Sequence, residues 1–108
     1  MSVVEMLKTL GMPVTYMTYQ KQTRPPFITY HGDGQDKMIA DDIPYLTRNN
    51  YTVEYYFTDK DSAREADIEA AFTACGYAYE KSEDVYINDE KLNVIYYTIW
   101  RKNYGRSE

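Results

Sequence analysis

The stretch that most constrains the fold of this chain is YTVEYYFTDKD at residues 51–61, where a tyrosine-rich run changes abruptly into charged residues. Every second residue of the run is aromatic or apolar, namely Tyr51, Val53, Tyr55 and Phe57. A period of two is typical of a strand with one buried face. Asp59 or Asp61 can cap a following helix, because a carboxylate accepts hydrogen bonds from its first backbone N–H groups. We therefore expect a core strand that leads directly into a helix over about residues 60–75, which Gly76 ends.

Local patterns predict the other elements in the same way. SVVE at residues 2–5 matches a capping box and predicts a helix over residues 3–10. Runs rich in Val, Thr and Tyr predict strands over residues 14–19, 27–31 and 77–81. Residues 85–101 predict a C-terminal hairpin around the turn NDEK. Its final strand is apolar or aromatic on both faces, which indicates a central strand or one that a partner covers.

Together these elements predict an α+β fold, in which a mostly antiparallel sheet of about five or six strands packs with two helices. At 108 residues the chain is expected to form a single domain, residues 1–108. Residues 32–50 show no sustained period and are expected to form a long loop, in which KMIADD can make a short strand or extended arm. Loops of this length are usually functional or mobile. The polar residues 102–108 are expected to be a frayed tail.

The charge and hydropathy of the chain argue against several classes of partner. The formal net charge is −5 and the sequence pI is about 4.8, whereas surfaces that grip a phosphate backbone rely on clustered Lys and Arg. We therefore expect no sequence-specific binding of nucleic acid. No apolar run approaches the roughly 20 residues that span a bilayer, and the N-terminus lacks the basic and hydrophobic parts of a secretion signal. A cytoplasmic protein without a membrane partner is therefore expected.

No arrangement of residues in the sequence indicates catalysis, a cofactor or a metal site. His31 is the single histidine, and no nucleophile turn of the GxSxG kind accompanies it. Asp59 and Asp61 match the first ligands of a calcium loop, but Arg64 stands where glycine is required, and the final glutamate is missing. The single cysteine, Cys75, falls on a helix face and is expected to be a small buried residue. We therefore expect a protein that is not an enzyme and holds no cofactor or metal ion.

Taken in order, these elements resemble a known group of proteins. The residues that carry the resemblance are PPFITYHG, the IADD of the following loop, YTVEYYFTDKDSAREADIEAAFTACGYAYEK and DVYINDEKLNVIYYTIW. They resemble the small tail proteins encoded in the head–tail module of long-tailed phages and prophages of low-GC Gram-positive bacteria, the tail terminator or tail-completion family. That family has a short aromatic strand, an Ala-Asp after a variable loop, a tyrosine-rich strand ending in Thr-x-Lys-Asp, an acidic helix and a final hairpin with a Tyr-Ile pair. The resemblance covers roughly residues 12–100.

The resemblance implies a structural protein without catalytic residues. It implies an α+β subunit that forms a ring, usually a hexamer, at the head-proximal end of the tail tube, where the ring stops tube polymerisation and gives the filled head a docking surface. The implied partners are other copies of the chain, the tail tube protein and a head–tail connector protein, and isolated subunits can remain monomeric. The implied location is the tail of the virion, after assembly in the cytoplasm of the bacterial host.

Expected exposure selects the candidate contact residues. Tyrosine suits subunit interfaces because it combines rigid apolar area with a hydroxyl group that tolerates water. Tyr56 and Tyr97, together with Tyr19, are expected on the less covered strand faces, unless a helix buries them. The long loop supplies the remaining candidates for contact with another subunit or the tube: Met38, Ile39, Asp41, Asp42 and Tyr45.

Two other functions fit the same sequence. A different head–tail component, such as a connector-layer or head-completion protein, would share the virion location but bind the portal side. A small non-enzymatic ligand-binding or regulatory domain would share the alternation of helices and strands, which is common to many functions. Such a domain would be monomeric and would contain a closed apolar pocket.

Overall fold

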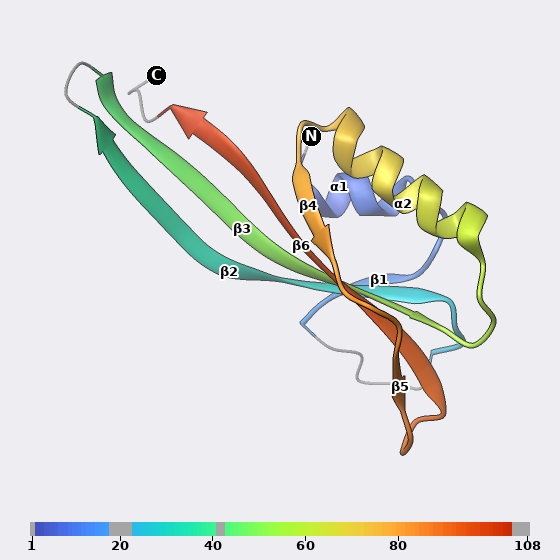
Figure 1. Cartoon of the computed structure of the whole chain (residues 1–108). Coiled ribbons are helices and arrows are strands. Elements are labelled where there is room, and N and C mark those ends of the chain that lie inside the picture. Colours follow the sequence, from blue (N-terminus) through green and yellow to red (C-terminus); the bar gives the residue numbers. More distant parts are fainter. Residues whose placement is uncertain (1, 18–22, 41–42, 105–108) are drawn as a thin grey trace.

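The computed structural model describes residues 2–17, 23–40 and 43–104, with the backbone alone for residues 35–40, 43–48 and 102–104. Over this part of the chain the elements are α1 (Val3–Lys8), β1 (Val14–Tyr16), β2 (Phe27–Ala40), β3 (Ile43–Phe57), α2 (Ser62–Ala74), β4 (Ala78–Lys81), β5 (Val85–Ile87) and β6 (Leu92–Tyr104) (Figure 1). The strands form one sheet in the order β1–β2–β3–β6–β4, with β5 also paired to β6. Only the β1–β2 pair is parallel among these described pairs. The predicted α+β fold with a mostly antiparallel sheet is confirmed.

Helix α1 begins at the predicted capping box. The Ser2 hydroxyl accepts a hydrogen bond from the Glu5 N–H at 3.2 Å, and the Glu5 carboxylate accepts one from the Ser2 N–H at 2.8 Å. The helix ends at Lys8, not at residue 10 as expected, because the next turn is tighter. In that turn the Leu10 N–H donates to the Leu7 carbonyl, three residues back, at 3.1 Å.

Helix α2 follows β3 directly, as the change of chemistry after residue 57 predicts. Asp61, and not Asp59, is its N-cap: the carboxylate accepts a hydrogen bond from the Arg64 N–H at 3.1 Å. Gly76 lies just beyond the helix with a φ of +82°, a left-handed conformation that glycine adopts without strain. The helix is therefore fixed at both ends by residues that the sequence analysis identified.

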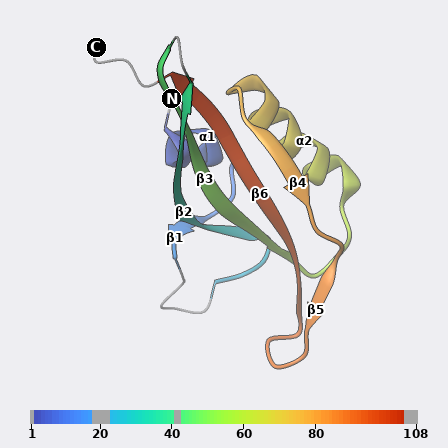
Figure 2. The same ribbon diagram turned by 60° about the vertical axis from the view of Figure 1, so that its left-hand side comes forward.

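Both helices pack against one face of the sheet and form a single core with it (Figures 1 and 2). The buried residues of this core are Val3, Met6, Leu7, Met12, Ile28, Val53, Tyr55, Phe57, Ile68, Phe72, Tyr77, Ile95, Tyr97 and Ile99. Tyr51 and Cys75 pack against this cluster and are half-buried. The alternation predicted for residues 51–57 is thus confirmed. Each large apolar side chain stabilises the fold by about 1.5–3 kcal/mol when fully buried, so this cluster is a major source of stability.

Residues 32–50 are not a long loop, contrary to the expectation from the sequence. β2 and β3 both continue through this segment and make one long hairpin. Residues 35–38 pair with residues 46–49 in unbroken register, and residues 101–104 of β6 pair with the other side of residues 46–49. We call this three-stranded extension, residues 35–40, 43–49 and 101–104, the arm.

The arm extends beyond the helices (Figure 1). The molecule measures 51 Å in its longest dimension and 25 and 24 Å in the other two. A two-residue period arises where one face of a strand is covered, and the helices do not cover the arm. The strands of the arm are paired through backbone hydrogen bonds, which every residue except proline can make, so this pairing produces no apolar pattern in the sequence. The absence of a period was therefore wrongly interpreted as the absence of strands.

Two further boundaries differ from the prediction. β1 covers three residues, and Met17 after it has a φ of +70°, which ends the extended conformation; Tyr19, from the predicted strand over residues 14–19, lies outside the described residues. β6 continues to Tyr104, so residues 102–104 belong to a strand and not to a frayed tail. Residues 105–108 lie outside the described residues.

Candidate interaction surfaces

The arm carries three of the predicted contact residues. Met38 and Ile39 lie in β2, and Tyr45 lies in β3. Met38 pairs with Leu46, the neighbour of Tyr45, so the hairpin brings the three positions together in the outer half of the arm. The two remaining candidates from this segment lie outside the described residues: Asp41 and Asp42. These three positions therefore lie on strands, whereas the sequence analysis assigned them to a loop.

Tyr97 does not lie on a less covered face, contrary to expectation. Its side chain is 0% exposed, and its ring packs edge-on against Phe72 with the centroids 5.2 Å apart. The hydroxyl group donates a hydrogen bond to Glu69 Oε2 at 2.8 Å. Burial, and then the hydrogen bond to Glu69, raise the pKa of Tyr97 well above its ordinary value. Helix α2 covers this face of β6, and the apolar residues on both faces of the strand could not reveal which face that is.

The sheet face opposite the helices carries Tyr56 and Tyr96. Tyr56 is half-buried: its ring stacks on Phe27 with the centroids 4.8 Å apart, and its hydroxyl donates to Glu54. Burial, together with the hydrogen bond to Glu54, raises the pKa of Tyr56 above its ordinary value. Tyr96 is 37% exposed and pairs in register with Glu54. The sequence analysis missed Tyr96 because it placed the neighbouring tyrosine on this face.

A polar group on this open face joins β2 and β3 where the arm begins. His31 Nε2 lies 3.2 Å from Asp33 Oδ1, and His31 Nδ1 lies 3.8 Å from Glu54 Oε2. The Thr52 hydroxyl donates to Asp33. The imidazole is thus held between two carboxylates that come from both strands. Among the described residues, no group of three or more His, Cys, Asp or Glu side chains is arranged to hold a metal ion.

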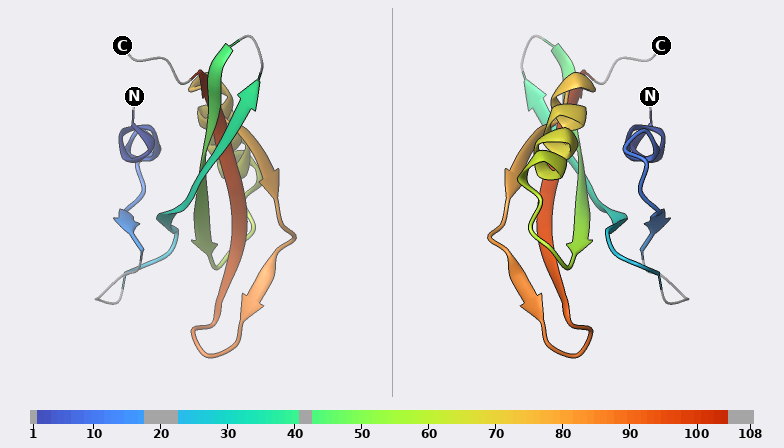
Figure 3. Two further views of the ribbon diagram at one scale, coloured as in Figure 1. Left: turned by 90° about the vertical axis from the view of Figure 1, so that its left-hand side faces the viewer. Right: turned by 90° about the vertical axis from the view of Figure 1, so that its right-hand side faces the viewer.

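The arm exposes two sheet edges. β1 pairs with β2 only as far as Tyr30, and β4 pairs with β6 only as far as Trp100. Beyond these points, within the part of the chain that the structure describes, β3 is the one strand that neighbours β2 and β6. Figure 3 shows the strand order from β1 at one edge to β4 and β5 at the other, with the arm rising above them. Among the described residues, 35–40 of β2 and 102–104 of β6 are therefore open edges, and open edges can pair with another chain.

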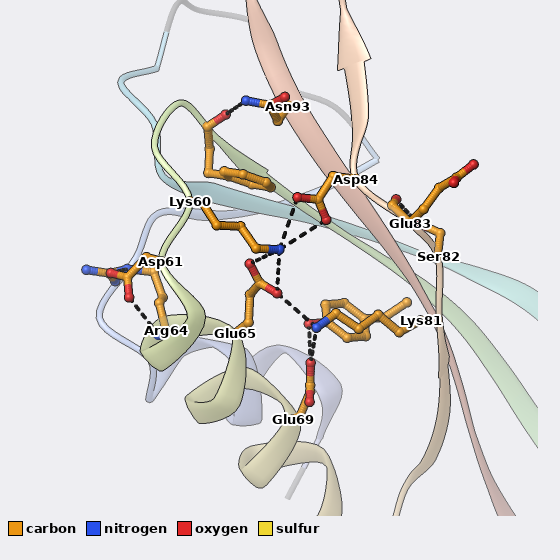
Figure 4. Close-up of polar contacts among 12 residues, drawn as sticks. Lys60, Asp61, Arg64, Glu65, Glu69, Lys81, Ser82, Glu83, Asp84 and Asn93 are labelled. Carbon is orange, nitrogen blue, oxygen red and sulfur yellow. Dashed lines mark hydrogen bonds and ion pairs between the residues drawn. The ribbon is translucent and has the colours of Figure 1, made fainter.

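An ion-pair network anchors α2 to β4, at one edge of the sheet (Figure 4). Glu65 is only 3% exposed, and its two carboxylate oxygens each lie 2.8 Å from a lysine Nζ, one from Lys60 and one from Lys81. Lys81 also contacts Glu69 at 2.8 Å, and Lys60 contacts Asp84 at 3.0 Å. The network therefore links the start of α2, the strand β4 and the segment that follows it.

The charges in this network stabilise one another. Hydrogen bonds with Glu65 and Glu69 raise the pKa of Lys81. Burial alone would raise the pKa of Glu69, but hydrogen bonds from Lys81 and Tyr97 outweigh it and leave the pKa below its ordinary value. Each buried oxygen already has a cationic partner within the chain, so we assign the network a structural role. The sequence showed these acids, but two of the pairs, Lys81 with Glu65 and Lys60 with Asp84, join residues that are 16 and 24 positions apart in the chain.

A small cavity lies between the start of α2 and the proline pair Pro25–Pro26. Its volume is about 310 Å³. Its lining residues are Pro25, Pro26, Tyr55, Phe57, Thr58, Asp59, Lys60, Asp61 and Arg64. Four of these side chains are charged, whereas pockets for small ligands are mostly lined by apolar groups. The cavity does not match the closed apolar pocket that a ligand-binding domain would need.

Comparison with known proteins adds no family to these observations. No protein-family model matches the chain, and no curated protein matches it significantly. Within the described residues, no helix is both long enough and apolar enough to cross a membrane. The function is therefore inferred from the resemblance of the sequence and from the surfaces of the fold.

Proposed function

We propose that this chain is a structural subunit of the tail of a long-tailed phage or prophage, of the tail terminator or tail-completion kind. Copies of the chain form a ring at the head-proximal end of the tail tube. The ring stops growth of the tube and provides the surface that joins the filled head to the tail. The partners of the subunit are its own copies, the tube protein and a head–tail connector protein.

The observation that carries this proposal is the arm. The described core lies between the helices and the sheet face that they cover, and the arm extends beyond the helices. Open sheet edges are a liability, because they can pair with any other exposed strand. A small domain that extends three strands beyond its helices is best explained if those strands contact another subunit. An α+β subunit with such an arm agrees with the fold that the resemblance implies.

The charge of the chain supports the same role. A ring at the head-proximal end of a tail surrounds the path along which DNA leaves the head. DNA passes such a ring most freely when the protein offers few cationic contacts to the phosphates, because bound Lys and Arg release counterions and retain the duplex. The net charge of −5 is consistent with a lumen of this kind.

Deletion of the gene tests the proposal. Phage particles produced without this protein should show tail tubes of irregular, excessive length and filled heads without tails in electron micrographs. Expression of the chain from a plasmid should restore normal joined particles. Tails of normal length and normal attachment would contradict the proposal.

The same micrographs separate the second candidate, a connector-layer or head-completion protein. Loss of such a protein should leave tails of normal length together with heads that fail to join them. The open aromatic face around Tyr56 and Tyr96 would then be the candidate surface for the portal side. The two roles therefore differ in a single measured quantity, the length distribution of the free tails.

A further inference from the structure

We infer that the open edge of β6 in one copy pairs with the open edge of β2 in the next copy, so that subunits associate head to tail through one continuous sheet. This inference rests on the ring-forming part of the proposed function and specifies its contact. The two segments are residues 102–104 of β6 and residues 35–40 of β2. Strand addition at an open edge is an established mode of association between protein chains.

The arrangement of the strands permits this pairing on both sides of each subunit. The two open edges flank the same central strand, β3, so one copy offers an edge to each of two neighbours. β2 and β6 each run antiparallel to β3 and therefore run parallel to each other. When all copies point the same way, β6 of one copy meets β2 of the next as a parallel pair. The chain already contains a parallel pair, β1 with β2.

Symmetry makes the result a ring. A contact between two different surfaces is heterologous, and it generates a closed ring when the rotation between copies returns to the start. A contact of β2 with β2, or of β6 with β6, would instead be isologous and would stop at a dimer. The choice between these contacts therefore decides whether the arm can build a ring.

Charge argues against one of the two isologous contacts. Residues 35–40 of β2 contain one aspartate and one lysine, whereas residues 101–104 of β6 contain one arginine, one lysine and no acidic residue. Like charges on facing strands destabilise a pair, and opposite charges stabilise it. Pairing of two β6 edges brings two basic segments together, whereas pairing of β6 with β2 brings a basic segment against one that also carries an aspartate.

The length of the edges explains how such a subunit can remain monomeric until it assembles. The β6 edge offers three residues, and bulges bound the regular part of the β2 edge at residues 35–38. A contact this short is weak by itself and becomes stable when ring closure adds contacts or when a template holds several subunits together. Association should therefore depend steeply on protein concentration and weaken as salt is added.

Proline substitution blocks each edge separately. Successive residues of a strand point their N–H groups alternately to either side, so one residue of each adjacent pair faces the open edge. On β2 the pair is Asp36→Pro and Lys37→Pro, and on β6 it is Lys102→Pro and Asn103→Pro. In each pair, one proline removes an N–H that faces the open edge, and the other removes an N–H that bonds to β3. The first is the edge-blocked variant and should keep the wild-type circular dichroism spectrum and melting temperature, and the second is its matched control. If all four misfold, the charge variants Asp36→Lys and Lys102→Glu replace them.

Analytical ultracentrifugation over a concentration series at low salt then gives the result. The wild-type chain should form species larger than a dimer, and each edge-blocked variant should be monomeric by itself. An equal mixture of the two edge-blocked variants should form dimers and nothing larger, because each retains one complementary edge. The charge variants should each weaken association when measured alone.

Three outcomes would overturn the inference: a wild-type chain that stays monomeric at every concentration, a blocked variant that still dimerises alone, or a mixture that stays monomeric. These outcomes are distinct from failure of the proposed function. Rings that persist in both blocked variants would refute the edge contact and leave the ring-forming role intact. Normal particles after gene deletion would refute the tail role whatever the edges do.

Discussion

The body of the molecule and its arm are built on the same three strands but are held together differently. In the body, the segments of β3 and β6 that face the helices bury residues such as Val53, Ile95 and Ile99, each 0% exposed. In the arm, the same strands continue past the helices, and the contact that defines them is backbone pairing. We therefore propose a division of roles, in which the body supplies stability and the arm supplies contact with other subunits.

The largest expected effect is loss of a core ring in the body. Phe72 is 0% exposed and packs against Tyr79 and Tyr97. Phe72→Ala should lower the free energy of unfolding by about 3–5 kcal/mol, because it removes buried area and leaves a cavity. Urea denaturation measures this change. Tyr86→Ala, at a residue that is 55% exposed, is the control and should change little; equal effects at both sites would contradict the assignment of stability to the buried core.

The ion-pair network should contribute less than the core. Glu65→Gln removes the buried charge that Lys60 and Lys81 share. We expect a loss of about 1–3 kcal/mol in the free energy of unfolding, below the full cost of a broken buried pair, because both lysines remain partly exposed to water. Asp67→Asn, which removes an acidic charge at an exposed position of α2, is the matched control. A wild-type melting temperature for Glu65→Gln would show that the network adds no stability.

Acid should weaken the body through Glu69. Its pKa in the folded chain lies below the ordinary value of 4.5, despite burial, because Lys81 and Tyr97 donate hydrogen bonds to the carboxylate. The unfolded chain therefore takes up this proton first as the pH falls. The contribution of Glu69 to stability is complete above pH 4.5 and is lost as the pH falls through the folded pKa. Over this acid range the melting temperature of Glu69→Gln should fall less steeply with pH than that of the wild type. If the two melting temperatures fall in parallel, Glu69 makes no pH-dependent contribution to stability.

The smallest effect on stability should come from shortening the arm. Asp36 and Arg48 face each other in register, so residues 37–47 can be replaced by the turn Asn-Gly. Because the described core is built by residues outside this segment, the free energy of unfolding should change by about 1 kcal/mol or less. Self-association should be lost in the same variant, as measured by ultracentrifugation. A loss of stability comparable to that of Phe72→Ala would mean that the arm belongs to the folding core.

The body could be predicted from the sequence because burial and capping leave local patterns. Tyr51 to Phe57 alternate because one face of β3 is buried, and the cap at Asp61 and the glycine at Gly76 mark the ends of α2. The arm left no such pattern, since neither helix covers it. Local patterns also could not show which face of β6 meets α2, and this is why Tyr97 was placed on the surface and Tyr96 was missed.

The candidate contact surface was predictable only in part for the same reason. Met38, Ile39 and Tyr45 were selected because residues 32–50 had no other assignment, and they do gather in the arm. The open edges depend on where β1 and β4 stop pairing, at Tyr30 and Trp100. That is a property of the assembled sheet, and no single segment of the sequence encodes it.

Amide hydrogen exchange, followed peptide by peptide in dilute and concentrated protein, tests the division between body and arm most directly. In dilute solution, peptides from residues 35–49 should exchange much faster than those from residues 51–57 and 92–99, because local opening costs less outside the core. On concentration, exchange should slow in residues 35–40 and 102–104 and stay constant in the body. An arm as protected as the body in dilute protein, or one that concentration leaves unchanged, would contradict the assignment of stability to the body and assembly to the arm.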